Sequence, residues 1–309
     1  MVSCQPPWAG HGFGSAYLGV RVQPPPTEGG PLEDLHSQLS PVRPRGRWLI
    51  DWSSGGTIDV TAFCGPSAVA ATSHTLPHDM TTFGFVHGAY HGSWCWQPLI
   101  EELERRGHQG LVVDLPCEDP GAGALDYAEA AIEAFSGGPP ELVVVGHSLA
   151  GLTIPLVATR RPVARLVYLC AMLPRPGRSQ EDTISAEPDM VLAGPEGGSY
   201  VGGDGATRWH EDAATEWFFA DCAPDVATWA ARQLRGQFWK ITQEACPLQA
   251  WPDIPSTSLI GSHDPVINPA WSRRITPTVL GVNPIELDCG HSPFLSTTSV
   301  LAETLLALP

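Results

Sequence analysis

Apolar and polar positions change in a regular rhythm from residue 80 to the end of the chain. Short apolar runs rich in β-branched residues are typical of strands buried on both faces of a parallel sheet. They predict strands at 81–88, 110–116, 141–147, 163–172, 256–262 and 283–289. Between them, amphipathic segments predict helices at 96–107, 125–135, 149–160 with a bend at Pro155, and 293–308. Repeated strand–helix units predict an α/β fold, a doubly wound and mostly parallel sheet that binds ligands at the carboxyl ends of its strands.

Residues 173–255 interrupt this rhythm. They contain glycine-rich loops, two helical stretches and five of the eleven tryptophans, which are Trp209, Trp217, Trp229, Trp239 and Trp251. An insertion between two sheet strands that is rich in large apolar residues predicts a helical cap, because such loops often shape a ligand pocket. The alternative is a second structural layer with no role in binding.

The first 79 residues have a different composition. Glycine and proline make up 20 of these 79 residues, against 43 of the remaining 230. Two segments, "RWLIDW" and "TIDVTAFC", have the composition of short strands, but no periodic pattern links them. We interpret residues 1–79 as a poorly ordered extension. Met80 opens the folded pattern, and we hypothesise that it is the natural start.

Composition excludes several classes of protein. The net charge of −16 argues against a nucleic-acid partner, which requires a basic face. No apolar run approaches the length of a membrane span, and no signal peptide is recognisable, so we expect no membrane contact. The eight cysteines form no Cys-x-x-Cys pair and no zinc-type cluster, so we expect mostly buried thiols, no metal and no cofactor. The cysteine usage favours a cytoplasmic location, and the oligomeric state stays open.

The segment "VVVGHSLAGL" carries the first candidate for chemistry. Ser148 follows a predicted strand and opens a predicted helix, which is the setting of a nucleophile elbow with the spacing Gly-x-Ser-x-Gly. Ala150 stands where that motif has its second glycine, and the next glycine is Gly151. The alternative is a serine that caps a helix. The segment therefore indicates a nucleophile without proving one.

Two further residues complete a catalytic triad. Asp264 follows the strand at 256–262, and His291 follows the strand at 283–289. The order serine, aspartate, histidine is that of α/β-hydrolases, and all three residues lie at the carboxyl ends of strands. In this arrangement His291 takes the proton of Ser148 and Asp264 orients His291. The neighbouring His263 and Asp288 are the alternatives.

An oxyanion hole requires two backbone N–H donors. Leu149, the residue after the nucleophile, is the first candidate. Ala89 is the second, in the loop "HGAYHGSWCW" after the first strand, where Gly88 permits a close approach of the backbone. Gly88, His91 and Trp209 are the candidates for the substrate pocket.

The segments "FVHGAYHGSWCW", "VVVGHSLAGL", "GSHDPV" and "GHSPFLS" together resemble the α/β-hydrolase family of plant methyl-ester esterases, plant hydroxynitrile lyases and related bacterial esterases. The resemblance covers residues 81–308. It implies a triad of Ser148, Asp264 and His291, with Ala89 and Leu149 as oxyanion donors. The plant lyases carry a threonine at the position of Gly88 and a lysine after the catalytic histidine, where this chain has Ser292.

These observations predict a cofactor-independent serine hydrolase that cleaves a carboxylic ester of a small apolar or aromatic substrate through an acyl-enzyme. One alternative is another reaction on the same triad, such as a carbon–carbon lyase or hydrolase, for instance a hydroxynitrile lyase, or a lactonase. The other is a non-catalytic receptor for small molecules, because a fold alone does not fix function.

Overall fold

The computed structural model describes residues 48–51, 59–62 and 80–309. Strands β1 (Trp48–Asp51) and β2 (Asp59–Ala62) pair with each other in an antiparallel arrangement. They fall within the two segments whose composition favours strands. The rest of the extension predicted for residues 1–79 lies outside the described residues.

A six-stranded sheet organises residues 80–309. Its strands lie in the order β10-β9-β6-β5-β3-β4, and every neighbouring pair is parallel. The bounds are Thr82–Val86 for β3, Gln109–Val112 for β4, Val143–His147 for β5, Arg165–Leu169 for β6, Ser256–Gly261 for β9 and Ile285–Leu287 for β10. The chain reverses its direction of winding between β4 and β5, so β3 and β5 flank the switch point where such sheets bind ligands. The predicted fold class is confirmed.

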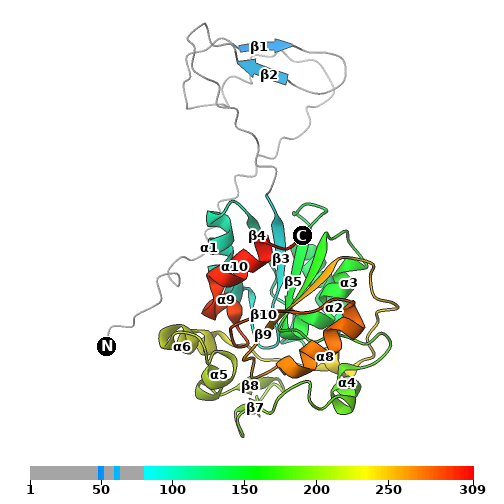
Figure 1. Cartoon of the computed structure of the whole chain (residues 1–309), viewed down its shortest axis with the longest axis vertical. Coiled ribbons are helices and arrows are strands. Elements are labelled where there is room, and N and C mark those ends of the chain that lie inside the picture. The colour runs from blue at the N-terminus through cyan, green and yellow to red at the C-terminus, as the bar shows by residue number, and fades with distance from the viewer. Residues whose placement is uncertain (1–47, 52–58, 63–79) are drawn as a thin grey trace. The chain divides into compact units, whose positions relative to one another are not determined.

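Helices cover both faces of the sheet (Figure 1). One face carries α1 (Gln97–Arg105), α9 (Pro293–Ser296) and α10 (Thr298–Leu306), and a short helix η2 (Ser93–Trp96) precedes α1. The other face carries α2 (Ala124–Ala134), α3 (Ile154–Ala158) and α8 (Pro269–Leu280). Both layers close over apolar cores, and the largest fully buried side chains include Phe83, Phe85, Trp96, Tyr127, Tyr168 and Trp271.

Three helical features differ from the sequence prediction. The pattern did not predict α8, whose interior proline, Pro277, is unusual in a helix. The helix expected at 149–160 is divided into η3 (Ser148–Leu152) and α3, with Pro155 in the first turn of α3. The closing helix is divided at Thr297, whose backbone is not helical.

Residues 173–255, which we call the cap, contain several short elements. These are α4 (Gln180–Ala186), the hairpin of β7 (Ser199–Val201) and β8 (Thr207–Trp209), α5 (Glu211–Phe218), α6 (Pro224–Gln233) and α7 (Lys240–Gln243). Within residues 80–309, Figure 1 shows α5, α6 and the hairpin at the end toward which the sheet strands run. The cap therefore lies on the side of the sheet where β3 and β5 end.

Within the described part of the chain, no helix is both long and apolar enough to span a membrane. Of the cysteines described, five are buried and Cys246 is partly buried. These thiols contribute to the apolar core, as expected from the sequence.

Candidate active site

Ser148 is the first residue of η3 and forms a sharp turn directly after β5. Its φ of 53° lies in the left-handed region, which is uncommon for a residue with a side chain and marks a strained turn. The turn is fixed by a hydrogen bond of 3.1 Å from the N–H of Met172 to the carbonyl of Ser148. A Cβ atom on Gly151 would lie 1.9 Å from the carbonyl oxygen of Met172. Glycine is therefore required at Gly151, whereas Ala150 is accommodated in the core at 1% exposure.

Ser148, His291 and Asp264 form one hydrogen-bonded chain. The Oγ atom of Ser148 lies 3.1 Å from Nε2 of His291, and Nδ1 of His291 lies 2.9 Å and 3.0 Å from the two carboxylate oxygens of Asp264. Oδ1 of Asp264 also accepts hydrogen bonds from the N–H groups of Val266 and Ile267, at 2.8 Å and 3.0 Å. All three side chains are buried, so little water competes for these bonds. Their roles at the ends of three parallel strands match a nucleophile, a base and an orienting acid.

The two alternatives for the acid and the base lie elsewhere. Nε2 of His263 pairs with Oδ1 of Asp288 at 2.9 Å, and the two side chains are 73% and 93% exposed. This pair lies on the surface, so the geometry brings Asp264 and His291 to Ser148 instead.

The loop after β3 passes close to Ser148 at Gly88, the residue before Ala89. The carbonyl of Gly88 accepts a hydrogen bond from Nδ1 of His87 at 2.8 Å, and the carbonyl of Ala89 accepts one from Nδ1 of His91 at 2.7 Å. Within the described part of the chain, the Ala89 N–H has no hydrogen-bond acceptor. Leu149 lies in the first turn of η3, where backbone N–H groups lack partners inside the helix. Both predicted oxyanion donors are therefore available to a ligand.

Three buried histidines surround this site in the neutral form. Burial lowers the pKa of His87 to about 4 and that of His91 to about 3. Burial, and then the nearby His291, lower the pKa of His147 well below its usual range. His147 lies against His291, with ring centroids 4.6 Å apart, and its Nε2 bonds the carbonyl of His291 at 2.9 Å. The imidazole rings of His87, His91 and His147 around the site are therefore uncharged.

The predicted pocket residues lie around the same point. A Cβ atom on Gly88 would lie 2.8 Å from Cβ of Ser148 and 2.8 Å from Nδ1 of His147, so the loop approaches the nucleophile as closely as glycine allows. His91 stacks on Trp94 and is buried beside the loop. Its Nε2 has no partner among the described residues.

Trp209 belongs to an aromatic cluster with two residues that sequence reasoning missed, Tyr90 and Phe218. The ring centroid of Trp209 lies 6.2 Å from that of Tyr90 and 5.1 Å from that of Phe218. The ring of Phe218 also lies 6.1 Å from that of His291 and 5.9 Å from that of His91. Phe218 therefore joins the cap to the catalytic groups. Tyr90 was identifiable as the residue after Ala89, whereas the "WFF" segment gives no sign that Phe218 faces His291.

One group of potential metal ligands coincides with this site. The ligand atoms of Cys170, Asp264 and His291 all lie within 4.8 Å of one another, and no other such group occurs in the described residues. Two of the three side chains are already hydrogen-bonded to each other. A metal ion would displace the proton between them, so the arrangement favours a proton relay over metal binding.

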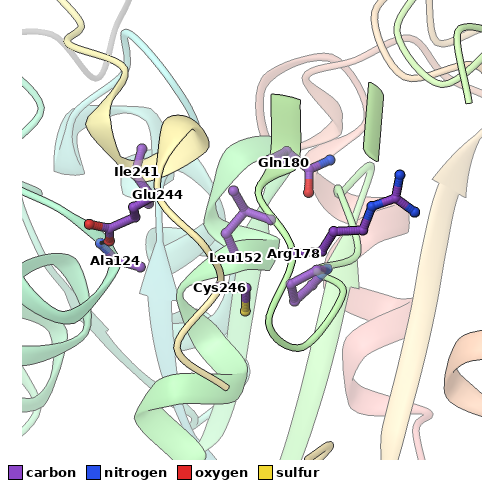
Figure 2. A pocket seen from close by; sticks show the side chains of 8 residues that line it. Ala124, Leu152, Arg178, Gln180, Ile241, Glu244 and Cys246 are labelled. Atoms are coloured by element: carbon purple, nitrogen blue, oxygen red, sulfur yellow. Dashed lines mark hydrogen bonds between the residues drawn. The ribbon is translucent and has the colours of Figure 1, made fainter. Parts of the chain in front are cut away.

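A separate pocket marks the place where the cap returns to the core (Figure 2). It is lined by Ala124, Leu152, Pro174, Arg178, Gln180, Ile241, Glu244 and Cys246, and includes no member of the triad. Glu244 lies beside Ala124, and its Oε1 accepts the N–H of Ala124 at 2.6 Å, which caps the start of α2. This contact anchors the end of the cap to the core.

Comparison with known proteins agrees with the fold. A model of the "Alpha/beta hydrolase family" matches residues 85–304, and the chain therefore belongs to the α/β-hydrolase family. The family resemblance expected from the motifs is confirmed.

Relatives and solved structures extend this result. "Probable esterase PIR7A" of Oryza sativa subsp. indica is 35% identical over 113 residues, which cover 33% of this chain and 43% of that protein. The match thus spans less than half of that relative. "Alpha/beta hydrolase nvfD" of Aspergillus novofumigatus is 27% identical over 240 residues, or 71% of this chain and 93% of that protein. The crystal structure of polyneuridine aldehyde esterase has a TM-score of 0.61 at 20% identity, covering 74% of this chain and 98% of its own, which shows the shared fold.

Proposed function

We propose that this protein is a serine esterase that cleaves a carboxylic ester through an acyl-enzyme. The observation that carries the proposal is the hydrogen-bonded chain from Ser148 through His291 to Asp264, with Ser148 on a strained turn at the carboxyl end of β5. A serine hydroxyl is a weak nucleophile until a neighbouring base removes its proton, and this geometry provides that base.

The reaction begins when Ser148 Oγ attacks the ester carbonyl and transfers its proton to Nε2 of His291. The carboxylate of Asp264 stabilises the resulting imidazolium. The N–H groups of Ala89 and Leu149 stabilise the negative charge on the carbonyl oxygen. His291 then protonates the departing alcohol, and it later activates the water that releases the acid.

The surroundings of the triad favour an ester over a cyanohydrin. A threonine side chain, which the resembling plant lyases carry at the position of Gly88, would begin with a Cβ atom 2.8 Å from Ser148 Cβ. Ser292, which stands where those lyases have a lysine, is fully buried and uncharged. Departing cyanide would therefore lack a stabilising cation.

The aromatic cluster indicates the class of substrate. The rings of Tyr90, Trp209 and Phe218 pack together, and that of Phe218 lies beside His291. Such surfaces bind apolar or aromatic groups. We therefore propose an ester of a small apolar or aromatic acid or alcohol. The esterase names of several relatives agree with this proposal.

The test measures hydrolysis of small p-nitrophenyl esters by the wild-type chain and by Ser148→Ala. We expect hydrolysis to fall to the background rate in the variant while its thermal unfolding is unchanged. A fluorophosphonate probe should label the wild type, and peptide mass spectrometry should locate the label at Ser148. Turnover by Ser148→Ala at the wild-type rate would disprove the proposal. Labelling without ester turnover would point to a different reaction on the same triad, and neither activity nor label would point to a receptor.

A further inference from the structure

The peptide group between Ala89 and Tyr90 is held at both ends. Its carbonyl oxygen accepts a hydrogen bond from His91 Nδ1 at 2.7 Å, and its N–H donates to Oε1 of Gln237 at 3.3 Å. The carbonyl of Tyr90 accepts a further hydrogen bond from the N–H of Arg235 at 2.7 Å. Both backbone groups of Tyr90 are thus bound by residues 235–237 of the cap.

This attachment is needed because Tyr90 is strained. Its φ of 64° lies in the left-handed region, which is unfavourable for a residue with a bulky side chain and persists only where the surroundings impose it. The Ala89 N–H belongs to the preceding peptide group, between Gly88 and Ala89, so relaxation of Tyr90 would reach it through the backbone dihedral angles of Ala89. The cap contacts therefore act on the predicted oxyanion donor indirectly, through one residue.

Gln237 is well placed to impose this conformation. Its side chain is buried, and its Nε2 donates to the hydroxyl of Tyr127 on α2 at 3.0 Å. This contact orients the amide so that Oε1 faces the N–H of Tyr90. The backbone of Gln237 exchanges two hydrogen bonds with Thr207 of the cap hairpin, at 2.9 Å and 3.0 Å. One residue thereby connects the loop after β3, the core helix α2 and the cap.

We propose that Gln237 is a positioning residue for the oxyanion hole, acting through the Tyr90 peptide to direct the N–H of Ala89 at the reacting carbonyl. This inference rests on the proposed esterase function. It assigns the cap a part in transition-state stabilisation in addition to its contribution to the pocket. The effect should appear in the transition state and not in ground-state binding, because the negative charge on oxygen exists only after attack.

The test uses Gln237→Met, which keeps the side-chain volume but removes the acceptor for the Tyr90 N–H. Loss of a whole oxyanion donor costs on the order of 100–1000-fold in kcat, so misdirecting one should cost about 10–100-fold. We expect kcat for a p-nitrophenyl ester to fall by that factor, with KM within twofold of the wild type. The inhibition constant of a trifluoromethyl ketone, which forms an oxyanion adduct with the serine, should rise in parallel.

Two further variants distinguish positioning from a general loss of structure. Thr207 lies in the cap hairpin, and its side-chain hydroxyl accepts a hydrogen bond from Nε1 of Trp239. Thr207→Val removes this hydrogen bond, and both kcat and ketone affinity should stay within twofold of the wild type. Tyr127→Phe removes only the hydroxyl that orients the Gln237 amide, and it should lower both quantities by less than Gln237→Met does. This second variant decides the matter if Gln237→Met does not fold.

An active wild type whose kcat and ketone affinity are unaffected in Gln237→Met and Tyr127→Phe would overturn this inference alone. An effect confined to KM, or an equal loss in Thr207→Val, would also overturn it. A wild type that neither hydrolyses esters nor reacts with the fluorophosphonate would instead disprove the proposed function, and the inference would fail with it.

Discussion

Replacing Asp264 with asparagine should invert the hydrogen-bond direction of the whole relay. Oδ1 of Asp264 accepts two backbone N–H groups, from Val266 and Ile267. An asparagine at this position must keep its oxygen toward those donors, so its NH₂ group replaces Oδ2 and faces Nδ1 of His291. Oδ1 also lies 3.0 Å from Nδ1, but its two lone pairs are taken by the two backbone donors. Since the NH₂ group can only donate, His291 must carry its proton on Nε2. The Nε2–H then donates to Ser148 Oγ and no longer accepts the serine's proton.

The size of the expected loss in kcat follows from the wrong tautomer of His291. The corresponding substitution in a serine protease triad lowers kcat about 10⁴-fold with its geometry intact, which is about 5 kcal/mol of transition-state stabilisation. We expect a loss of that order here in Asp264→Asn. The unfolding temperature should change little, because both backbone hydrogen bonds and the side-chain volume are kept.

The assay compares kcat for a p-nitrophenyl ester at pH 7.5 among the wild type, Asp264→Asn and Asp288→Asn. Asp288 is the matched control, since it pairs with the exposed His263 in the same manner on the surface. Asp288→Asn should retain the kcat of the wild type. A loss of less than tenfold in Asp264→Asn, or an equal loss in Asp288→Asn, would refute the assignment of the acid.

Two further predictions concern stability. In Gly151→Ala the new Cβ atom would lie 1.9 Å from the carbonyl oxygen of Met172, so the free energy of unfolding in urea should fall by at least the roughly 1–3 kcal/mol typical of overpacking. Ala150→Gly should lower it by about 1 kcal/mol or less and should keep activity. Equal stability of the two variants would contradict this account of the turn. In the folded chain His87 and His91 have pKa values of about 4 and about 3, so they stay neutral at a pH where the unfolded histidines bind protons. The free energy of unfolding should therefore keep their whole contribution above pH 6.5 and fall as the pH drops toward 4. Each contributes about 1 kcal/mol per pH unit, so urea unfolding at pH 6.5, 5.5 and 4.5 should show a shallower slope for His91→Gln than for the wild type.

The strands and the order of the triad were predictable because each depends on local pattern. Buried parallel strands are continuous apolar runs, and Ser148 and Asp264 each follow one of them. His291 follows the short edge strand β10, which is largely exposed. Parallel pairing brings the carboxyl ends of strands to one edge, so residues up to 143 positions apart meet without any further sequence signal. By contrast, α8 was missed because two prolines, Pro269 and Pro277, obscure a helix that tertiary packing of Trp271 and Ile275 stabilises.

The turn after Ser148 shows why Ala150 can stand where the motif has a glycine. The pattern assigns the need for a small residue to the second position after the serine. Here the closest backbone approach is at Gly151, where the carbonyl of Met172 crosses the turn. The elbow therefore requires room for the carbonyl of Met172 at Gly151. The Gly-x-Ser-x-Gly pattern specifies the position of Ala150 instead.

The contribution of Gln237 was beyond prediction for a different reason. Its partner Tyr90 lies 147 residues away, and both lie outside regular elements, so no periodicity aligns them. Tyr90, the residue after Ala89, adopts a left-handed backbone that is unfavourable for a residue with a bulky side chain. A strained residue beside a functional group requires a support elsewhere in the chain. In this protein, residues 235–237 of the cap hold both backbone groups of Tyr90.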